Sequence, residues 1–275
     1  MGIIDHGQKP RVLVSVKGHP YPRDGFFGLL ESMDDLAFTA VEQPASQLFF
    51  TPRQGADYDA LLVYDMPGID FASHPPRLIP PPAELVEGFP ALLEEGRGCV
   101  FLHHAIAGWP LWPEYAEIIG GRFLYLPGEL RGAPCLDSGY RHAVDYRARV
   151  VAEHPVTEGV DGDFPITDEL YLYQVFEDDL IPLLRSGHRF ERENFYSARE
   201  AAEGRLYSNA DWPHPPGSDL IGWVKHYCNS PIVYLQPGDD QAAYDNPAFR
   251  RLLHNALRWV ASDAARAWAR ARNGG

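Results

Sequence analysis

Histidine and aspartate side chains that could bind a metal ion or transfer a proton follow several predicted strands of this chain. Two adjacent histidines, His103 and His104, come directly after one such strand. Four more residues of these types follow other predicted strands, namely His19, Asp65, Asp239 and Asp240. Imidazole and carboxylate groups gathered at one place suit either a divalent cation or general acid–base catalysis. The residues alone leave both alternatives open.

The elements that must position these side chains alternate between strand and helix through the first 120 residues. Short apolar runs predict strands at 11–16, 38–42, 61–64 and 99–102. Apolar residues at helical spacing follow the first and third of these runs. The alternation predicts right-handed crossovers and a doubly wound, mainly parallel sheet. In such a sheet ligands bind beyond the carboxyl ends of the strands, where the histidines and aspartates stand.

The second half of the chain is richer in strands. Candidate strands lie at 142–151, 180–184, 220–227 and 232–235. We expect them to form an antiparallel extension of the same sheet, and we expect the polar segment 187–217 to be a lid or an insertion. An amphipathic helix is predicted from Pro247 to Val260, with a frayed tail over 264–275. The prediction is therefore a single domain, 1–275, with its core at about 11–262.

Composition and charge exclude several classes of protein. The 275 residues include 24 Lys and Arg against 38 Asp and Glu, a net charge of −14, which disfavours binding to nucleic acid. Every apolar run is far shorter than the ~20 residues of a membrane helix, and Met1–Lys9 has no secretion signal. The three cysteines are widely spaced, so we expect a cytoplasmic protein. A homo-oligomer remains open.

Nucleotide cofactors and covalent amide hydrolysis are not expected. The sequence contains neither a Walker loop nor a G-x-G-x-x-G fingerprint. In class I glutamine amidotransferases a nucleophilic cysteine occupies the sharp turn after a central strand. Here that turn holds His103 and His104, while Cys99 lies inside the predicted strand, and no G-x-S-x-G elbow is present. The chain is therefore not predicted to be a glutamine amidotransferase.

A second group of candidates combines carboxylates with aromatic residues. Asp168 and Glu169 precede Tyr171 and Tyr173. A carboxylate beside an apolar wall can have its pKa raised and then serve as an acid or a base. Tyr173 and Trp109 could supply such a wall for a sugar ring. Exposed acidic pairs and ordinary core packing are alternative roles for these residues, and both interpretations remain open.

Five segments of the sequence resemble the ThuA-like family, the trehalose-utilisation proteins, whose domain is similar to the class I glutamine amidotransferase fold. The segments are Gly18-His19, His103 to Trp109 with Tyr115 to Phe123, His154 to Gly159, Asp168 to Tyr171, and Tyr244 to Trp259. The resemblance implies a flavodoxin-like sheet and a role in carbohydrate metabolism, in some members with 3-keto sugars. It also implies functional positions at His19, His103, His104 and Glu169.

The sequence departs from this family at Gly238-Asp239-Asp240. The family usually reads Gly-His-Asp there, so Asp239 replaces a histidine. An aspartate can bind a hard divalent cation, but it cannot act as a neutral imidazole ligand or proton shuttle.

These observations predict an enzyme that acts on an unphosphorylated sugar or keto-sugar, since an acidic rim disfavours a phosphate. The predicted catalytic residues are His103, His104 and Glu169. The predicted substrate-binding residues are Trp109, Tyr173 and Asp65. The predicted ligands of a divalent metal, zinc, manganese or magnesium, are His19, His104, Asp239 and Asp240. The alternative is a non-catalytic module, on the same fold, that binds a sugar or another small molecule.

Overall fold

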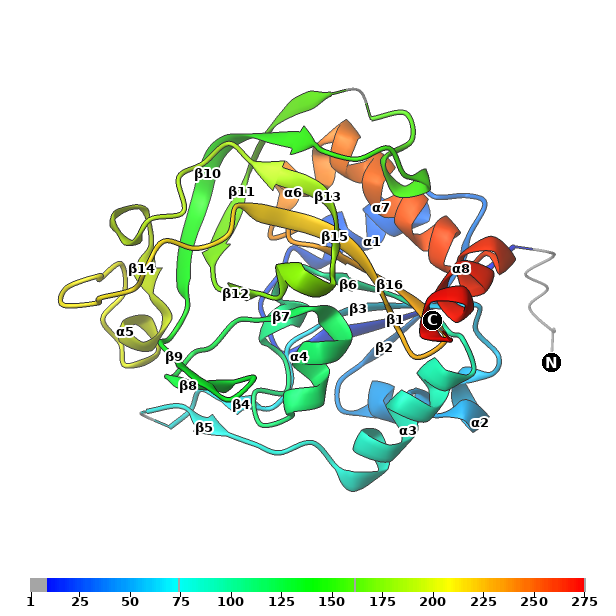
Figure 1. Ribbon diagram of the computed structural model, residues 1–275, viewed down its shortest axis with the longest axis horizontal. Helices are drawn as coiled ribbons and strands as arrows, with labels where there is room; N and C mark the ends of the chain where they lie inside the picture. The colour runs from blue at the N-terminus through cyan, green and yellow to red at the C-terminus, as the bar shows by residue number, and fades with distance from the viewer. Residues whose placement is uncertain (1–8, 74, 161, 275) are drawn as a thin grey trace.

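The computed structural model describes residues 9–73, 75–160 and 162–274, which are built around one mixed β-sheet (Figure 1). Its parallel strands are β1 (Arg11–Lys17), β2 (Ala37–Glu42), β3 (Ala60–Asp65), β6 (Gly98–Leu102) and β16 (Ser230–Leu235). They lie side by side in the order β2-β1-β3-β6-β16. This is the 2-1-3-4-5 order of flavodoxin-like sheets, and it confirms the predicted fold class.

An antiparallel extension continues the sheet beyond β16. Its strands, in order outward, are β15 (Leu220–Tyr227), β13 (Ile181–Ser186), β10 (Gly139–Val150) and β11 (Asp163–Leu172). Three of these strands agree with the predicted ones, whereas β11 was not predicted. The sequence of β11 contains Pro165 and three acidic residues, all of types that are depleted in strands. An edge strand tolerates such residues, and β11 lies at the edge of the sheet.

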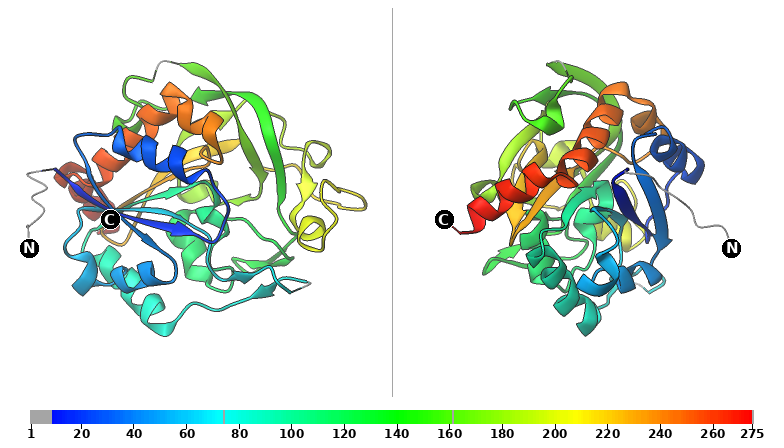
Figure 2. Two further views of the ribbon diagram at one scale, coloured as in Figure 1. Left: turned by 180° about the vertical axis from the view of Figure 1, so that it is seen from behind. Right: turned by 90° about the vertical axis from the view of Figure 1, so that its right-hand side faces the viewer.

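Helices cover both faces of the sheet (Figure 2). One face carries α1 (Arg23–Glu31), α6 (Gln241–Asp245), α7 (Pro247–Val260) and α8 (Asp263–Asn273), and the other carries α2 (Pro52–Gly55), α3 (Ala83–Glu94) and α4 (Pro113–Ile119). Strand β1 shows how the two cores are separated: Val12 and Val14 belong to the first core and Leu13 to the second. Successive side chains of a strand point to opposite faces, so a continuous apolar run fills both cores.

Shorter elements surround the sheet. They are β4 (Ile69–Asp70), β5 (Arg77–Leu78), β7 (Gly121–Arg122), β8 (Gly128–Leu130), β9 (Ala133–Cys135), β12 (Gln174–Val175), β14 (Tyr196–Ser197), α5 (Ala198–Ala202) and the 3-10 turns Ala45–Phe49, His103–Ala107, Pro155–Thr157, Glu177–Asp179 and Arg192–Asn194. Strand β14 and helix α5 belong to the segment 187–217.

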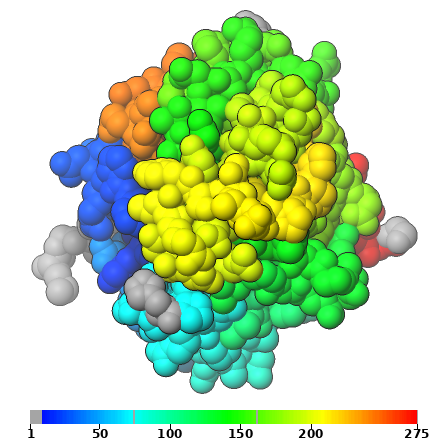
Figure 3. Space-filling model, turned by 90° about the vertical axis from the view of Figure 1, so that its left-hand side faces the viewer, coloured from blue at the N-terminus to red at the C-terminus, as the bar shows by residue number. Residues whose placement is uncertain are grey.

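The segment 187–217 is attached to the rest of the chain by a buried carboxylate. Asp137 accepts hydrogen bonds from the Ser197 hydroxyl, the Arg199 backbone N–H and the Trp212 indole. Strand β14 also pairs with β10. In Figure 3 the segment, yellow, lies in the middle of one face of the molecule, between the blue N-terminal part and the green middle of the chain.

The C-terminal tail is ordered, contrary to the predicted fraying. Helix α8 begins at a serine cap, where the Ser262 hydroxyl accepts from the Ala265 backbone N–H at 3.1 Å. Ala265 and Ala269 are fully buried, and the ring of Trp268 packs edge-on against Trp259 with 5.3 Å between centroids. The prediction of fraying was wrong because it rested on the Ala/Arg composition alone. The small side chains of Ala265 and Ala269 allow α8 to pack closely against the rest of the protein.

Among the described residues, every helix is too short or too polar to cross a membrane. The prediction that Met1–Lys9 is not a secretion signal concerns residues that mostly lie outside the described part of the chain, which begins at residue 9.

Replacing Trp268 with Ala tests the packing of α8. Because Trp268 is partly buried, we expect the free energy of unfolding in urea to fall by about 1–3 kcal/mol, less than for a fully buried Trp. Arg270→Ala, at an exposed position of the same helix, is the control and should change stability by less than about 0.5 kcal/mol. Equal, small effects of both variants would contradict the packing of α8 described above.

Candidate functional site

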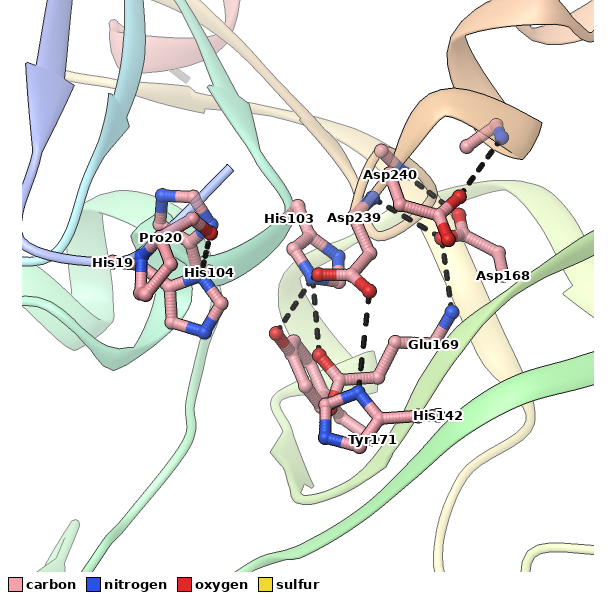
Figure 4. Close-up of polar contacts among 12 residues, drawn as sticks. His19, Pro20, His103, His104, His142, Asp168, Glu169, Tyr171, Asp239 and Asp240 are labelled. Carbon is pink, nitrogen blue, oxygen red and sulfur yellow. Dashed lines mark hydrogen bonds and ion pairs between the residues drawn. The ribbon is translucent and has the colours of Figure 1, made fainter. Parts of the chain in front are cut away.

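Four segments of the chain bring polar side chains together beyond the carboxyl ends of β6 and β16. His103 directly follows β6, His142 lies on β10, Glu169 and Tyr171 lie on β11, and Asp239 lies in the turn between β16 and α6. Figure 4 shows these five side chains pointing toward one another. We call them the imidazole–carboxylate cluster.

Hydrogen bonds and ion-pair contacts connect the members of the imidazole–carboxylate cluster. His103 Nε2 lies 3.2 Å from Glu169 Oε2, 3.4 Å from Asp239 Oδ1 and 2.8 Å from the Tyr171 hydroxyl. His142 Nδ1 lies 3.1 Å from the other oxygen of Glu169 and 4.0 Å from Asp239 Oδ2. His103 is fully buried, whereas 48% of the His142 side chain is exposed. The cluster thus extends from the core to the surface.

Backbone contacts fix the direction of His103. Its Nδ1 lies 2.7 Å from the carbonyl oxygen of Gln236, to which an Nδ1–H can donate. This contact orients the ring so that Nε2 faces Glu169 and Asp239. His103 also has φ of 50°, a left-handed conformation that is uncommon for residues other than glycine and that often marks functional sites.

Asp168 holds the Asp239 turn against β11. Its side chain accepts from the backbone N–H of Gly238 at 2.7 Å, of Asp239 at 3.1 Å and of its neighbour Glu169 at 2.9 Å. Gly238 has φ of 132°, and a Cβ there would lie 3.2 Å from the ring of Phe249, so the turn favours glycine. Asp168 and Glu169 point to opposite faces of β11, one toward the turn and the other toward His103.

Burial and contacts with charged neighbours have opposite effects on the pKa values in the imidazole–carboxylate cluster and of the adjacent Asp168. Burial alone would lower the pKa of His103, but its contacts with Asp239 and Glu169 hold that pKa well above the usual value. Burial would raise the pKa of Asp239, but its contacts with His103 and His142 hold it well below the usual range. Contact with Asp239 raises the pKa of His142, against the effect of burial. Burial raises the pKa of Asp168 to about 7, although the nearby His103 and the backbone N–H groups of Gly238 and Asp239 lower it.

Two further histidines form a separate neutral pair. The rings of His19 and His104 stack with 4.6 Å between centroids. His19 Nδ1 lies 2.8 Å from the carbonyl oxygen of Pro20, and His104 Nε2 lies 3.3 Å from that of Tyr64. Burial lowers the pKa of His19, and burial together with the nearby His19 holds the pKa of His104 well below its usual value. Both rings are therefore uncharged at neutral pH.

A small cavity of about 160 Å³ lies beside the imidazole–carboxylate cluster. Its lining residues are His19, Phe123, Tyr125, Tyr140, His142, Glu169, Tyr171, Ala198, Ala201, Leu206 and Tyr207. The last four belong to the segment 187–217, which therefore forms one wall of the cavity. A larger open depression, lined by residues that include Val150 and His154, contains none of the clustered side chains.

The structure brings together some of the residues predicted from the sequence. His103, Glu169 and Asp239 meet in the imidazole–carboxylate cluster, and His19 lines the cavity. His104 lies under the ring of His19, and its Nδ1 is buried without a hydrogen-bond partner among the described residues.

Four other predicted residues lie away from the cavity lining. Asp240 caps α6, where its Oδ1 accepts from the backbone N–H of Ala242 at 2.8 Å. Trp109 is buried and packs against Gly68, and Tyr173 is buried against Tyr171 and Tyr234. Asp65 is buried at the end of β3, where it accepts from the Ser15 hydroxyl of the neighbouring β1 and from Gln43 Nε2. Turn formation and core packing account for all four positions.

His142 belongs to the imidazole–carboxylate cluster, although no role was predicted for it from the sequence. Its position depends on an irregularity in β10, where the pairing with β11 shifts between Arg141 and Val144 and Ala143 has φ of 52°. Bulges of this kind re-aim side chains and are common beside active sites. The bulged residues, 141–144, include neither Gly nor Pro, and Gly139 lies at the start of β10, before the bulge. Nothing in the sequence pattern at 141–144 therefore signals the bulge.

Comparison with known proteins identifies the family. The family model described as ThuA, trehalose utilisation, matches residues 16–260. The chain belongs to the ThuA family. This membership confirms the resemblance found in the sequence, and the family description concerns carbohydrate use. The comparison with curated proteins gives no match.

Solved structures show the same fold as this ThuA-family chain. A ThuA-like protein from Parabacteroides merdae has a TM-score of 0.64 at 15% identity, covering 93% of this chain and 91% of its own. One from Bacteroides uniformis has a TM-score of 0.62 at 18% identity, covering 94% and 95%. A protein of Salmonella typhimurium described as cytoplasmic has a TM-score of 0.53 at 11% identity, covering 91% and 99%.

The buried carboxyl of Asp65 predicts a pH-dependent stability. Burial raises its pKa from 3.8 to about 6, although Ser15 and Gln43 donate to it. Because the folded state binds this proton more tightly than the unfolded state, the stabilisation is full below pH 4 and is lost as pH rises through 6. Relative to Asp65→Asn, wild type should lose about 2–3 kcal/mol of unfolding free energy between pH 4 and pH 7.

Denaturant titrations of both proteins at the two pH values measure this difference. A constant gap between wild type and Asp65→Asn would show that Asp65 is charged in both states.

Proposed function

We propose that this ThuA-family protein is an enzyme that acts on an unphosphorylated sugar or keto-sugar bound in the cavity, and that His19 and His142 transfer the protons. One observation carries the proposal: two histidines, each anchored through Nδ1, line the same small aromatic cavity. The carbohydrate-related description of the family supports the substrate class.

Anchoring through Nδ1 prepares each imidazole for proton transfer. His19 Nδ1 faces the Pro20 carbonyl at 2.8 Å, and His142 Nδ1 faces Glu169 at 3.1 Å. In the described part of the chain Nε2 of neither ring has a hydrogen-bond partner, so each Nε2 can serve a bound molecule. A carboxylate that holds the Nδ1–H of a histidine fixes its tautomer and orientation, as in hydrolase triads. Glu169 would be the positioning residue for His142.

The rest of the cavity suits a neutral polyhydroxyl compound. Five of its lining residues are Phe or Tyr, whose ring faces can pack against the C–H faces of a sugar. Among the described lining residues none is Lys or Arg, the side chains that usually bind phosphate. With Glu169 in the lining and a chain charge of −14, a phosphorylated sugar is disfavoured.

The reaction class that fits two such histidines is proton transfer next to a carbonyl. One Nε2 accepts a proton from the carbon beside the keto group, and the C–H electron pair becomes a carbon–carbon double bond. The carbonyl electron pair moves to oxygen, which takes a proton from the other histidine. His19 is the better base, because burial keeps its ring neutral. The resulting enediol leads to isomerisation or to elimination at the next carbon.

The test is a panel of 3-keto and unmodified glycosides incubated with the purified protein, with products identified by mass spectrometry. We expect turnover of a keto-glycoside by wild type, and a fall in kcat/KM of about 10²–10⁴-fold in His19→Gln and in His142→Gln. His254→Gln is the matched control, because His254 also pairs with a carboxylate, Asp35 at 2.7 Å, but lies outside the cavity lining.

Two outcomes would contradict the proposal. A sugar that raises the melting temperature without being converted would favour the non-catalytic binding module instead. Turnover that survives in both cavity variants would place the chemistry elsewhere in the molecule.

A further inference from the structure

We propose that His103, Glu169 and Asp239 bind one divalent transition-metal ion at the inner end of the imidazole–carboxylate cluster, with zinc as the best match. This set differs from the ligands predicted from the sequence and shares only Asp239 with them. It does not include His142, which stays available for proton transfer.

The spacing of the three donor atoms matches a metal site. His103 Nε2 lies 3.2 Å from Glu169 Oε2 and 3.4 Å from Asp239 Oδ1, and all three atoms lie within 4.8 Å of one another. In a tetrahedral zinc site with bonds of about 2.0–2.1 Å, neighbouring ligand atoms are about 3.3 Å apart. Both distances from His103 fit this value, and an ion could bind here if it draws the two carboxylate oxygens toward each other.

Two of the three ligands, His103 and Glu169, have an outer partner within hydrogen-bond distance, and Asp239 has a longer contact. The Gln236 carbonyl can accept the Nδ1–H of His103, which leaves the lone pair on Nε2. His142 Nδ1 faces the oxygens of Glu169 and Asp239 that point away from His103, at 3.1 Å and 4.0 Å. Outer contacts of this kind, from imidazole to a backbone carbonyl and from carboxylate to a hydrogen-bond donor, are usual around protein metal ions.

The backbone of the Asp239 ligand is held in the same way. Asp168 accepts its backbone N–H at 3.1 Å and so fixes the turn against β11. Two ligands on different segments, Glu169 and Asp239, are thereby kept at a constant separation. A preorganised set of this kind would lose little entropy on binding an ion.

The charges and donor atoms of the three ligands indicate which class of ion would bind. Two carboxylates and a neutral imidazole balance a charge of +2. One nitrogen and two oxygen donors suit zinc or manganese better than magnesium, which prefers oxygen ligands throughout. Three protein ligands leave a coordination position for water or substrate, as in catalytic zinc sites. Glu169 and Tyr171 both line the cavity, so that position would be reached from it.

The competing occupant is a proton on His103 Nε2, shared with the carboxylates and with the Tyr171 hydroxyl at 2.8 Å. The metal proposal does not depend on the proposed function, because binding is measured without a sugar. If chelator-treated, metal-free protein still converts a keto-glycoside, the proposed function stands and the ion takes no part in the reaction.

The test is metal loading of the full chain. Chelator-treated, desalted protein is equilibrated with zinc chloride, desalted again and assayed for zinc by mass spectrometry, with competition against a chromogenic chelator giving the affinity. We expect about one zinc per chain in wild type. Glu169→Gln and Asp239→Asn keep the side-chain shapes and should each weaken binding by ~100-fold or more, beyond the loss usual for outer-shell changes.

Asp35→Asn is the matched control, because Asp35 pairs with a histidine, His254, at 2.7 Å, and Asp35 is the one carboxylate paired with that ring among the described residues. It should bind zinc like wild type. Substituted cobalt provides a second readout, since a tetrahedral site gives an intense visible absorption that both site variants should lose. Near-UV circular dichroism confirms that each variant is folded.

Either of two results would overturn the proposal. The first is wild-type protein that retains no zinc and shows no cobalt absorption, in which case a proton occupies the cluster. The second is zinc binding that is equally strong in wild type, Glu169→Gln and Asp239→Asn, in which case the ion binds at another place.

Discussion

The contact on which the site depends is the buried carboxylate of Asp168. It accepts hydrogen bonds from backbone N–H groups of two segments. Gly238 and Asp239 donate from the turn between β16 and α6, and Glu169 donates from β11. A buried carboxylate is costly unless such donors surround it, so the turn and β11 stabilise each other through it. Because Glu169 and Asp239 are attached to these two backbones, their side chains meet at His103.

The sheet delivers the remaining groups to the same place. The carboxyl ends of β6 and β16 lie side by side, which brings His103 and the Asp239 turn together from distant parts of the sequence. The antiparallel extension then supplies His142 and Glu169 from β10 and β11, beyond the parallel strands. The parallel core thus provides the buried end of the site, and β10 and β11 of the extension provide part of the cavity lining. The segment 187–217 forms the outer wall.

Sequence reasoning located much of this site because buried strands give strong patterns. The apolar run before His103 predicted β6, and the rule that ligands bind beyond strand ends selected His103 and Asp239. Asp65 obeys the same rule, yet it turns inward to Ser15 and Gln43, contacts between separate segments that no local pattern reveals. Asp240 was predicted as a metal ligand but caps α6. Aspartate is common in both positions, so the residue type alone does not distinguish a helix cap from a metal ligand. The position of His142 depends on a bulge at 141–144, and these four residues include neither Gly nor Pro.

The central claim is that an unphosphorylated sugar binds in the aromatic cavity between His19 and His142. A crystal structure of the protein soaked with a 3-keto glycoside tests it most directly. The account predicts sugar density in that cavity, with a ring face against the tyrosines and an oxygen or carbon within hydrogen-bond reach of each Nε2. Density only elsewhere, for example in the open depression near Val150 and His154, would contradict it.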